Sequence, residues 1–168
     1  MDFGAQSAVT LINQYPNLLV IQTLSKSRSL AGLRVGFAFG SQELIEGLNR
    51  TKNSFNSYTL DRVAMAGAVA AIEDDEYFSE ITQKVIATRE RVKLSLEKLG
   101  FRYTDSKANF VFIHHPQVDA NQLFRGLRDK GILVRYFNAP RIDQYLRVSI
   151  GTDEEMDCFL DALKELVH

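Results

Sequence analysis

The sequence has little that would mark an extracellular or a nucleic-acid-binding protein. Cys158 is the only cysteine in 168 residues, so no disulfide can form within the chain, which fits a reducing cytoplasm. We expect its thiol to be packed on an amphipathic helix rather than reactive. Lysine and arginine number 20 against 21 acidic residues, and the resulting net charge of −1 offers no electrostatic basis for binding nucleic acid.

Long apolar runs and a basic leader are also absent. No stretch approaches the roughly 20 apolar residues that cross a bilayer, so we expect no membrane partner. The residues from Met1 to Gly4 lack the basic and apolar segments of a secretion signal, so we expect none. His114 and His115 would point to opposite faces of a strand, which argues against a metal site. Because 45% of the residues are apolar, we predict a globular cytoplasmic protein.

The first half of the chain offers too few strands for a sheet of its own. Strands are expected over residues 17–25, as a buried strand, and over residues 34–40. A short helix is expected over residues 8–14, a second one behind the N-cap Ser41, and an alanine-rich third one over 58–73. Since two strands make a poor free-standing sheet, we expect the remnant of a larger one.

The second half carries a more complete pattern. Asp75 is expected to cap a long amphipathic helix that ends at Gly100. A strand, a helix, two further strands and a last helix follow, and Thr152 opens the last helix with a capping box to Glu155. The first of these strands, over residues 108–115, is expected to be mostly buried. We therefore predict an α/β chain in three parts: a large-domain remnant over 1–74, a connecting helix over 75–100 and a small α+β domain over 101–168.

Lys26 is the residue best suited to chemistry. It directly follows the first expected strand, and ligands of α/β sheets bind at the carboxyl ends of strands. A partly desolvated lysine in such a place can form a Schiff base with a carbonyl compound. Thr23 and Ser25 precede it and Arg34 follows it, and hydroxyls with a guanidinium suit a phosphate group. The alternative is a surface lysine in an ordinary strand–loop–strand.

The stretch TLSKSRSLAGLRVGFAFG, residues 23–40, resembles the lysine signature of pyridoxal-phosphate-dependent aminotransferases of the aspartate-aminotransferase fold type. The resemblance continues through SKANFVFI, GILVRYF and YLRVSIGTDEEMDCFLDAL, and is greatest for the histidinol-phosphate aminotransferase branch. It implies that pyridoxal 5′-phosphate is the cofactor and that Lys26 is the catalytic lysine that binds it. It also implies that Ser25, Arg34 and, more weakly, Thr23 contact the cofactor phosphate.

The resemblance implies substrate contacts in the second half of the chain. Arg147 matches the arginine that binds the substrate carboxylate, a task suited to the guanidinium fork. Arg135 matches a residue that reaches toward the substrate phosphate or carboxylate. Without the resemblance, a surface or structural ion pair explains Arg147 better. The implied reaction is amino transfer between histidinol phosphate and 2-oxoglutarate in histidine biosynthesis, by a homodimer or other homo-oligomer.

Part of the site implied by the resemblance does not occur in this chain. The family's partner of the pyridine nitrogen, an aspartate, precedes the lysine motif, and so do a tyrosine, a stacking aromatic residue and a phosphate-binding turn. Asp2 does not match that aspartate, and the segment at Ser54 and Tyr58 departs from the family pattern. We therefore expect the C-terminal portion of a longer enzyme, inactive by itself. The alternatives are another aminotransferase or a decarboxylase of the same fold, and a non-catalytic oligomerising fragment.

Overall fold

The computed structural model describes residues 2–167 and has the expected mixed α/β architecture. The chain divides into two compact units, Met1–Ile81 and Thr82–His168, which we call the N-terminal and the C-terminal unit. The three-part division drawn from the sequence stays a prediction. Across the described residues, no helix combines the length and the apolar character needed to cross a membrane.

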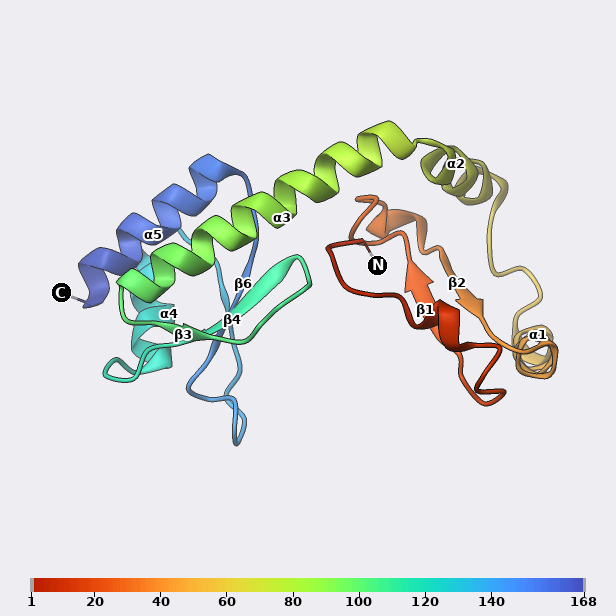
Figure 1. The fold of residues 1–168 in the computed structure, drawn as a ribbon, viewed down its shortest axis with the longest axis horizontal. Helices are drawn as coiled ribbons and strands as arrows, with labels where there is room; N and C mark the ends of the chain where they lie inside the picture. Colours follow the sequence, from red (N-terminus) through yellow and green to blue (C-terminus); the bar gives the residue numbers. More distant parts are fainter. Residues whose placement is uncertain (1, 168) are drawn as a thin grey trace. The chain divides into compact units, whose positions relative to one another are not determined.

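The N-terminal unit is built on an antiparallel hairpin (Figure 1). Strand β1 (Val20–Thr23) pairs with β2 (Gly36–Phe39) in the antiparallel sense. The other elements of this unit are the 3-10 helices η1 (Ala8–Leu11) and η2 (Ala31–Leu33), the helices α1 (Gln42–Phe55) and α2 (Arg62–Glu73), and the first residues of α3 (Asp75–Lys98). The helix expected over residues 8–14 is thus a shorter 3-10 helix.

Side-chain caps set where the helices of this unit begin. The Ser41 hydroxyl accepts a hydrogen bond from the Leu44 N–H at 3.4 Å, as expected for the N-cap of α1. The Asp61 carboxylate accepts one from the Ala64 N–H at 2.8 Å, so α2 begins later than the sequence predicted. The carboxylate that receives a backbone N–H at the start of α3 is Asp74 rather than Asp75.

The hairpin is buried on one face. Its core is a small cluster with α2 that comprises Leu24, Val35, Ala64 and Ala68, packed against Leu30, Leu33 and Phe37. Side chains alternate along a strand, so Ile21 and Thr23 point to the opposite face, where Ile21 is 70% exposed. The expectation of a fully buried strand over residues 17–25 is wrong, because this face is open.

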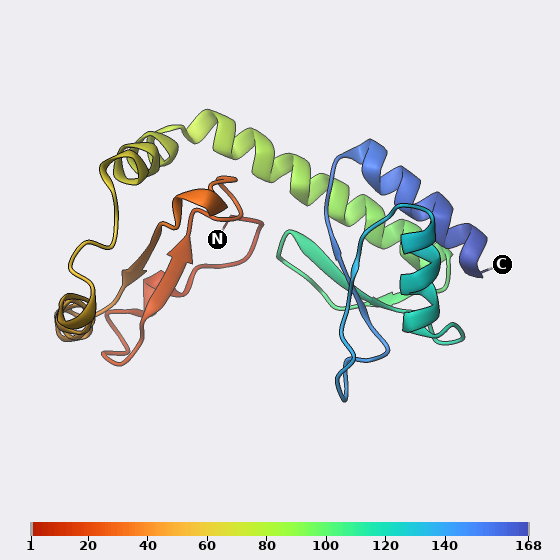
Figure 2. The same ribbon diagram turned by 180° about the vertical axis from the view of Figure 1, so that it is seen from behind.

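The C-terminal unit has an antiparallel sheet in the order β3-β4-β6-β5. Its elements are β3 (Arg102–Tyr103), β4 (Phe110–His114), α4 (Ala120–Asp129), β5 (Arg135–Tyr136), β6 (Leu146–Ser149) and α5 (Asp153–Val167), together with α3 from Thr82 onward. In both views α3 and α5 lie side by side (Figures 1 and 2), and Arg91 of α3 forms ion pairs with Asp153 and Asp157 of α5. Strand β3 was not expected, and β5 is shorter than its apolar run.

The sheet of the C-terminal unit also has one covered face. Val111 and Ile113 of β4 and Leu146 and Val148 of β6 are at most 3% exposed and pack with α3, α4 and α5. Their neighbours along the strands point away from the helices, and those on β4 are half-buried. No residue of 108–115 is exposed, so the expected mostly buried strand is confirmed. Cys158 of α5 is exposed, which corrects the expectation of a packed thiol.

Helix termini of this unit follow the sequence signals. Gly100 has a φ of 82°, and the Phe101 N–H donates to the Leu96 carbonyl at 2.9 Å, which closes α3 as expected. The Thr152 hydroxyl accepts from the Glu155 N–H at 3.3 Å, and the Glu155 carboxylate accepts from the Thr152 N–H at 2.9 Å. The predicted capping box of α5 is therefore confirmed.

Candidate active site

Lys26 lies in a turn directly after β1. The Ser29 N–H donates to the Lys26 carbonyl at 3.1 Å, so Lys26 is the first of four residues in a β-turn. The Leu30 N–H donates to the Leu24 carbonyl at 3.1 Å, which closes the loop behind this turn. Lys26 is exposed while Ser27 is 5% exposed, so the turn presents the amine and buries the next side chain.

The other three predicted cofactor contacts lie at the same end of the hairpin. Thr23 is opposite Gly36, and the Leu24 N–H donates to the Val35 carbonyl beyond this pair, so Ser25 and Arg34 are the next residues toward the connection. The Thr23 side chain lies on the open face of the hairpin, away from α2, Arg34 is exposed and Ser25 is half-buried. Two hydroxyls, an exposed guanidinium and the amine of Lys26 therefore gather around the β1–β2 connection.

The backbone around Arg34 is unusual. Arg34 adopts a left-handed conformation with a φ of 56°, and its Nη1 donates to the Ala31 carbonyl at 3.0 Å. A Cβ atom at Gly36 would lie 3.2 Å from the Gln22 carbonyl oxygen, so a side chain there would press on β1. The sequence Gly-Leu-Arg-Val-Gly thus lets the loop return tightly into β2 while the guanidinium stays exposed.

Arg135 and Arg147 lie directly opposite each other on β5 and β6 of the C-terminal unit. Both are exposed on the open face of the sheet, and both guanidinium groups approach the Phe137 ring, at 5.5 and 5.9 Å from its centroid. Arg147 also lies 5.5 Å from the centroid of Phe110. Like charges on directly opposed strand positions repel each other, so an anion that binds both would be favoured.

The six predicted residues thus form two groups, each within its own unit. Lys26, the two hydroxyl residues and Arg34 surround the connection of the N-terminal hairpin. Arg135 and Arg147 form a cationic pair on an aromatic surface of the C-terminal sheet. Arg135 and Arg147 lie on the face of their sheet that the helices leave uncovered, and in the first group Thr23 lies on the uncovered face of the hairpin. The first group suits a carbonyl and a phosphate, and the second suits a carboxylate or a phosphate.

The sequence analysis missed two buried cations of α3. Arg89 and Lys93 are 1% and 4% exposed and bind the segment before β4, with Arg89 Nη1 donating to the Ala108 carbonyl at 2.9 Å. Glu90 accepts from both cations. Partial burial acts to raise the pKa of Glu90, but the hydrogen bonds from Arg89 and Lys93 outweigh it, so this pKa lies below its usual value. Their helical spacing resembled that of ordinary surface charges, so no sequence signal marked them.

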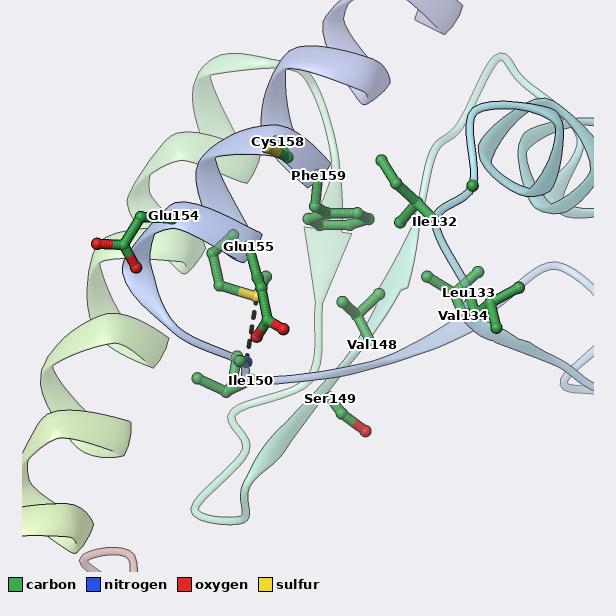
Figure 3. A pocket seen from close by; sticks show the side chains of 13 residues that line it. Ile132, Leu133, Val134, Val148, Ser149, Ile150, Glu154, Glu155, Cys158 and Phe159 are labelled. Carbon is green, nitrogen blue, oxygen red and sulfur yellow. Dashed lines mark hydrogen bonds between the residues drawn. The ribbon is translucent and has the colours of Figure 1, made fainter.

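A pocket of about 490 Å³ lies elsewhere in the C-terminal unit (Figure 3). It is bounded by the end of β6, the first turns of α5 and residues 131–134, and the Gly151 N–H donates to the Met156 sulfur at its edge. Glu154 and Glu155 add acidic groups to a lining that is otherwise mostly apolar and includes the hydroxyl of Ser149. These carboxylates oppose the binding of a phosphate or carboxylate, so the pocket does not suit the substrate predicted from the sequence.

Comparison with known proteins identifies the family. The model of the aminotransferase class I and II family matches residues 1–163. The chain belongs to this family. It is 61% identical over 167 residues to the histidinol-phosphate aminotransferase of Clostridium acetobutylicum, covering 99% of this chain and 47% of that protein. It is 62% identical to the protein of the same name from Marinomonas sp., over 99% of this chain and 48% of that protein.

A solved structure of the family agrees with the fold. Histidinol-phosphate aminotransferase from Sinorhizobium meliloti, in complex with pyridoxal-5′-phosphate, superposes with a TM-score of 0.84 at 26% identity. The match covers 99% of this chain and 46% of that one. The chain therefore spans about half the length of the curated relatives it matches. The resemblance inferred from residues 23–40 is confirmed at the level of the family.

Proposed function

We propose that this chain is the lysine-bearing portion of a pyridoxal-phosphate-dependent aminotransferase that transfers an amino group between histidinol phosphate and 2-oxoglutarate. The observation that carries the proposal is the placement of Lys26 in an exposed turn beside Ser25, Thr23 and Arg34. The substrate comes from the names of the relatives that are 61% and 62% identical.

The residues at the hairpin connection fit the cofactor chemically. An exposed primary amine suits its carbonyl group, and an exposed guanidinium with two hydroxyls suits its phosphate. Arg34, whose backbone is left-handed, donates from Nη1 to the Ala31 carbonyl, and the other N–H groups of its guanidinium can donate to phosphate oxygens. We therefore assign Lys26 to the carbonyl carbon of the cofactor, and Arg34, Ser25 and Thr23 to its phosphate.

We assign separate roles in amino transfer to Lys26, Arg147 and Arg135. Pyridoxal phosphate, when bound, supplies an electron-withdrawing ring beside the substrate α-carbon. The Lys26 amine would take the proton from the substrate α-carbon as a general base and would then donate it as a general acid. Arg147 holds the substrate carboxylate through its fork, and Arg135 adds a second positive charge for the substrate phosphate or carboxylate.

We further propose that the chain acts within a larger assembly. Its relatives are about twice as long, and the open apolar face of the hairpin would associate with other protein. We therefore expect a homodimer or other homo-oligomer and no turnover by this chain alone. The division into residues 1–74, 75–100 and 101–168 and the cytoplasmic location also remain proposals.

Titration of the purified chain with pyridoxal phosphate tests the assignment of Lys26. We expect an absorbance band at about 410–430 nm, typical of the cofactor bound to a lysine. Reduction with borohydride should fix the cofactor on Lys26, as located by peptide mass spectrometry, and Lys26→Ala should remove the band. Lys52→Ala, which changes an exposed lysine of α1, is the matched control and should keep it. Label spread evenly over surface lysines would contradict the proposal.

The substrate is tested after supplying the half of the relatives that this chain does not match. We expect this chain, co-expressed with the preceding half of the Clostridium acetobutylicum relative, to transfer the amino group of histidinol phosphate to 2-oxoglutarate. Preference for another amino acid, or release of carbon dioxide, would instead favour a different aminotransferase or a decarboxylase. A soluble complex with no turnover and no cofactor band would favour a non-catalytic oligomerising role.

A further inference from the structure

We propose that Arg28 is a positioning residue that fixes the turn carrying Lys26. This inference deepens the proposed function, and only its consequence for the cofactor rests on that function. Arg28 lies two residues after Lys26, yet its side chain points into the unit and is 14% exposed. It thereby links the Lys26 turn to helices that are more than forty residues away in the sequence.

The contacts of Arg28 form a clamp on the junction between α2 and α3. Its Nη1 donates to the Ala71 carbonyl and, at 3.1 Å, to the Asp74 carbonyl. Its guanidinium carbon lies 3.9 Å from the centroid of the Phe78 ring, which places a cation over an aromatic face. One planar group thus joins the turn to the last turn of α2 and to the first turn of α3.

The carbonyls explain the choice of a cation at this place. Ala71 lies in the last turn of α2, where the carbonyls and the helix dipole concentrate negative potential. The Asp74 carbonyl, which also accepts from the Phe78 N–H at 3.3 Å, is a second acceptor for the guanidinium. The Asp75 carboxylate is 3.7 Å away, but its side chain is 88% exposed, so solvent weakens this pair. The carbonyls and the Phe78 ring therefore provide most of the attraction.

The turn itself needs such an anchor. Arg28 is the third residue of the β-turn that begins at Lys26, and Ser29 has a φ of 56°. A left-handed conformation is unfavourable for serine, and it persists when the surroundings fix the chain on both sides. Buried Ser27 and the Arg28 clamp fix one side, and the Leu30-to-Leu24 hydrogen bond fixes the other. Loss of the clamp should release the turn and the direction of Lys26.

Hydrogen exchange of the full 168-residue chain, without cofactor, tests the clamp directly. In Arg28→Ala, the amides of Ser29 and Leu30 should exchange roughly 5–30-fold faster, the factor that corresponds to losing a few hydrogen-bonding contacts. Amides of β4 and β6 should not change. Arg50→Ala is the matched control, because the Arg50 side chain is 78% exposed and pairs only locally with Glu46. Equal exchange in the two variants would overturn the proposal.

Labelling of Lys26 separates positioning from a purely structural role. After treatment with pyridoxal phosphate and borohydride, the share of label on Lys26 should fall at least several-fold in Arg28→Ala, but not in Arg50→Ala. An unchanged share would overturn the positioning role even if exchange were faster. If Lys26 of the unaltered chain takes no preferential label, the proposed function fails, whereas the exchange experiment still decides whether the clamp holds the turn.

A milder variant covers the case in which Arg28→Ala unfolds the N-terminal unit. Arg28→Lys keeps the positive charge near Phe78 but lacks the fork that reaches both carbonyls. We expect this variant to keep the protection of the β1–β2 amides and to lose part of the protection at Ser29 and Leu30. Protection at Ser29 and Leu30 equal to that of the unaltered chain would overturn the proposal.

Discussion

The two units differ in how much of their sheets is covered by helices. In the C-terminal unit, three helices cover one face of a four-stranded sheet, and the buried core includes Leu127 and Leu163 at 0% exposure. The N-terminal unit covers a two-stranded hairpin with one small cluster and leaves Val63 at 76% and Ile21 at 70% exposure. The C-terminal unit therefore has a substantial core of its own, whereas most of the exposed large apolar side chains belong to the N-terminal unit, where other protein would cover them.

The largest expected effect concerns the core of the C-terminal unit. Leu127→Ala should lower its free energy of unfolding by about 2–5 kcal/mol, because the side chain is fully buried and leaves a cavity. Denaturant unfolding followed by circular dichroism measures the change. Leu133→Ala, at a side chain that is 83% exposed, is the control and should change stability by less than about 0.5 kcal/mol. Similar losses in both variants would contradict the assigned core.

The second prediction concerns the uncovered face of the N-terminal unit. Ile21→Lys should weaken self-association of the chain by about 1.5–3 kcal/mol, the value of one buried aliphatic side chain. Sedimentation at several concentrations measures the change. Gln42→Lys adds the same charge to an exposed position of α1 and should leave association unchanged. If Ile21→Lys and Gln42→Lys associate alike, the hairpin face is not the surface involved.

The third prediction uses the buried cations of the C-terminal unit. Glu90→Gln should lower the free energy of unfolding by about 1–2 kcal/mol at pH 7, because Arg89 and Lys93 lose a charged hydrogen-bond partner. The effect is modest because the Glu90 side chain is half exposed. The pKa of Glu90 is lowered in the folded state. Its ionised form therefore stabilises the fold above pH 4.5, the ordinary pKa, and this stabilisation is lost as the pH falls through the lowered pKa.

Urea unfolding between pH 7 and pH 3 checks this sign. The unaltered chain should lose more stability below pH 4.5 than Glu90→Gln does, so the two curves should converge in acid. Glu154→Gln changes an exposed glutamate of α5 and is the control. A constant difference between the chain and Glu90→Gln at all pH values would contradict the assigned hydrogen bonds.

The sequence predicted where helices begin and end better than it predicted which faces of the strands are buried. Ser41, Gly100 and Thr152 end or begin helices as expected, because caps depend on a few neighbouring residues. The strand around Ile21 was expected to be buried, because an apolar run carries no sign that one face lacks a cover. Strand β3 has two residues, too few for a periodic pattern.

The candidate site shows the same contrast between local motifs, which the sequence reveals, and contacts between distant residues, which it does not. Lys26 and Arg34 belong to a motif with fixed spacing, so the sequence alone singled them out. Arg28 stands in a serine-rich loop with no pattern of its own, and its partners at the α2–α3 junction come from a distant part of the chain. The opposition of Arg135 and Arg147 depends on strand register, which needed the observed pairing of β5 with β6.

The smallest expected effect concerns the turn that distinguishes the N-terminal hairpin from an ordinary loop. Ser29→Gly should stabilise the unit by about 0.5 kcal/mol, because glycine adopts a φ of 56° without steric cost but loses more entropy on folding. Thermal unfolding and exchange of the Leu30 amide measure the gain. Ser57→Gly changes an exposed serine without a left-handed backbone and should slightly destabilise the N-terminal unit, because only the entropy loss of glycine remains. A loss of stability in Ser29→Gly would mean that the serine side chain, rather than the Arg28 clamp, maintains the turn.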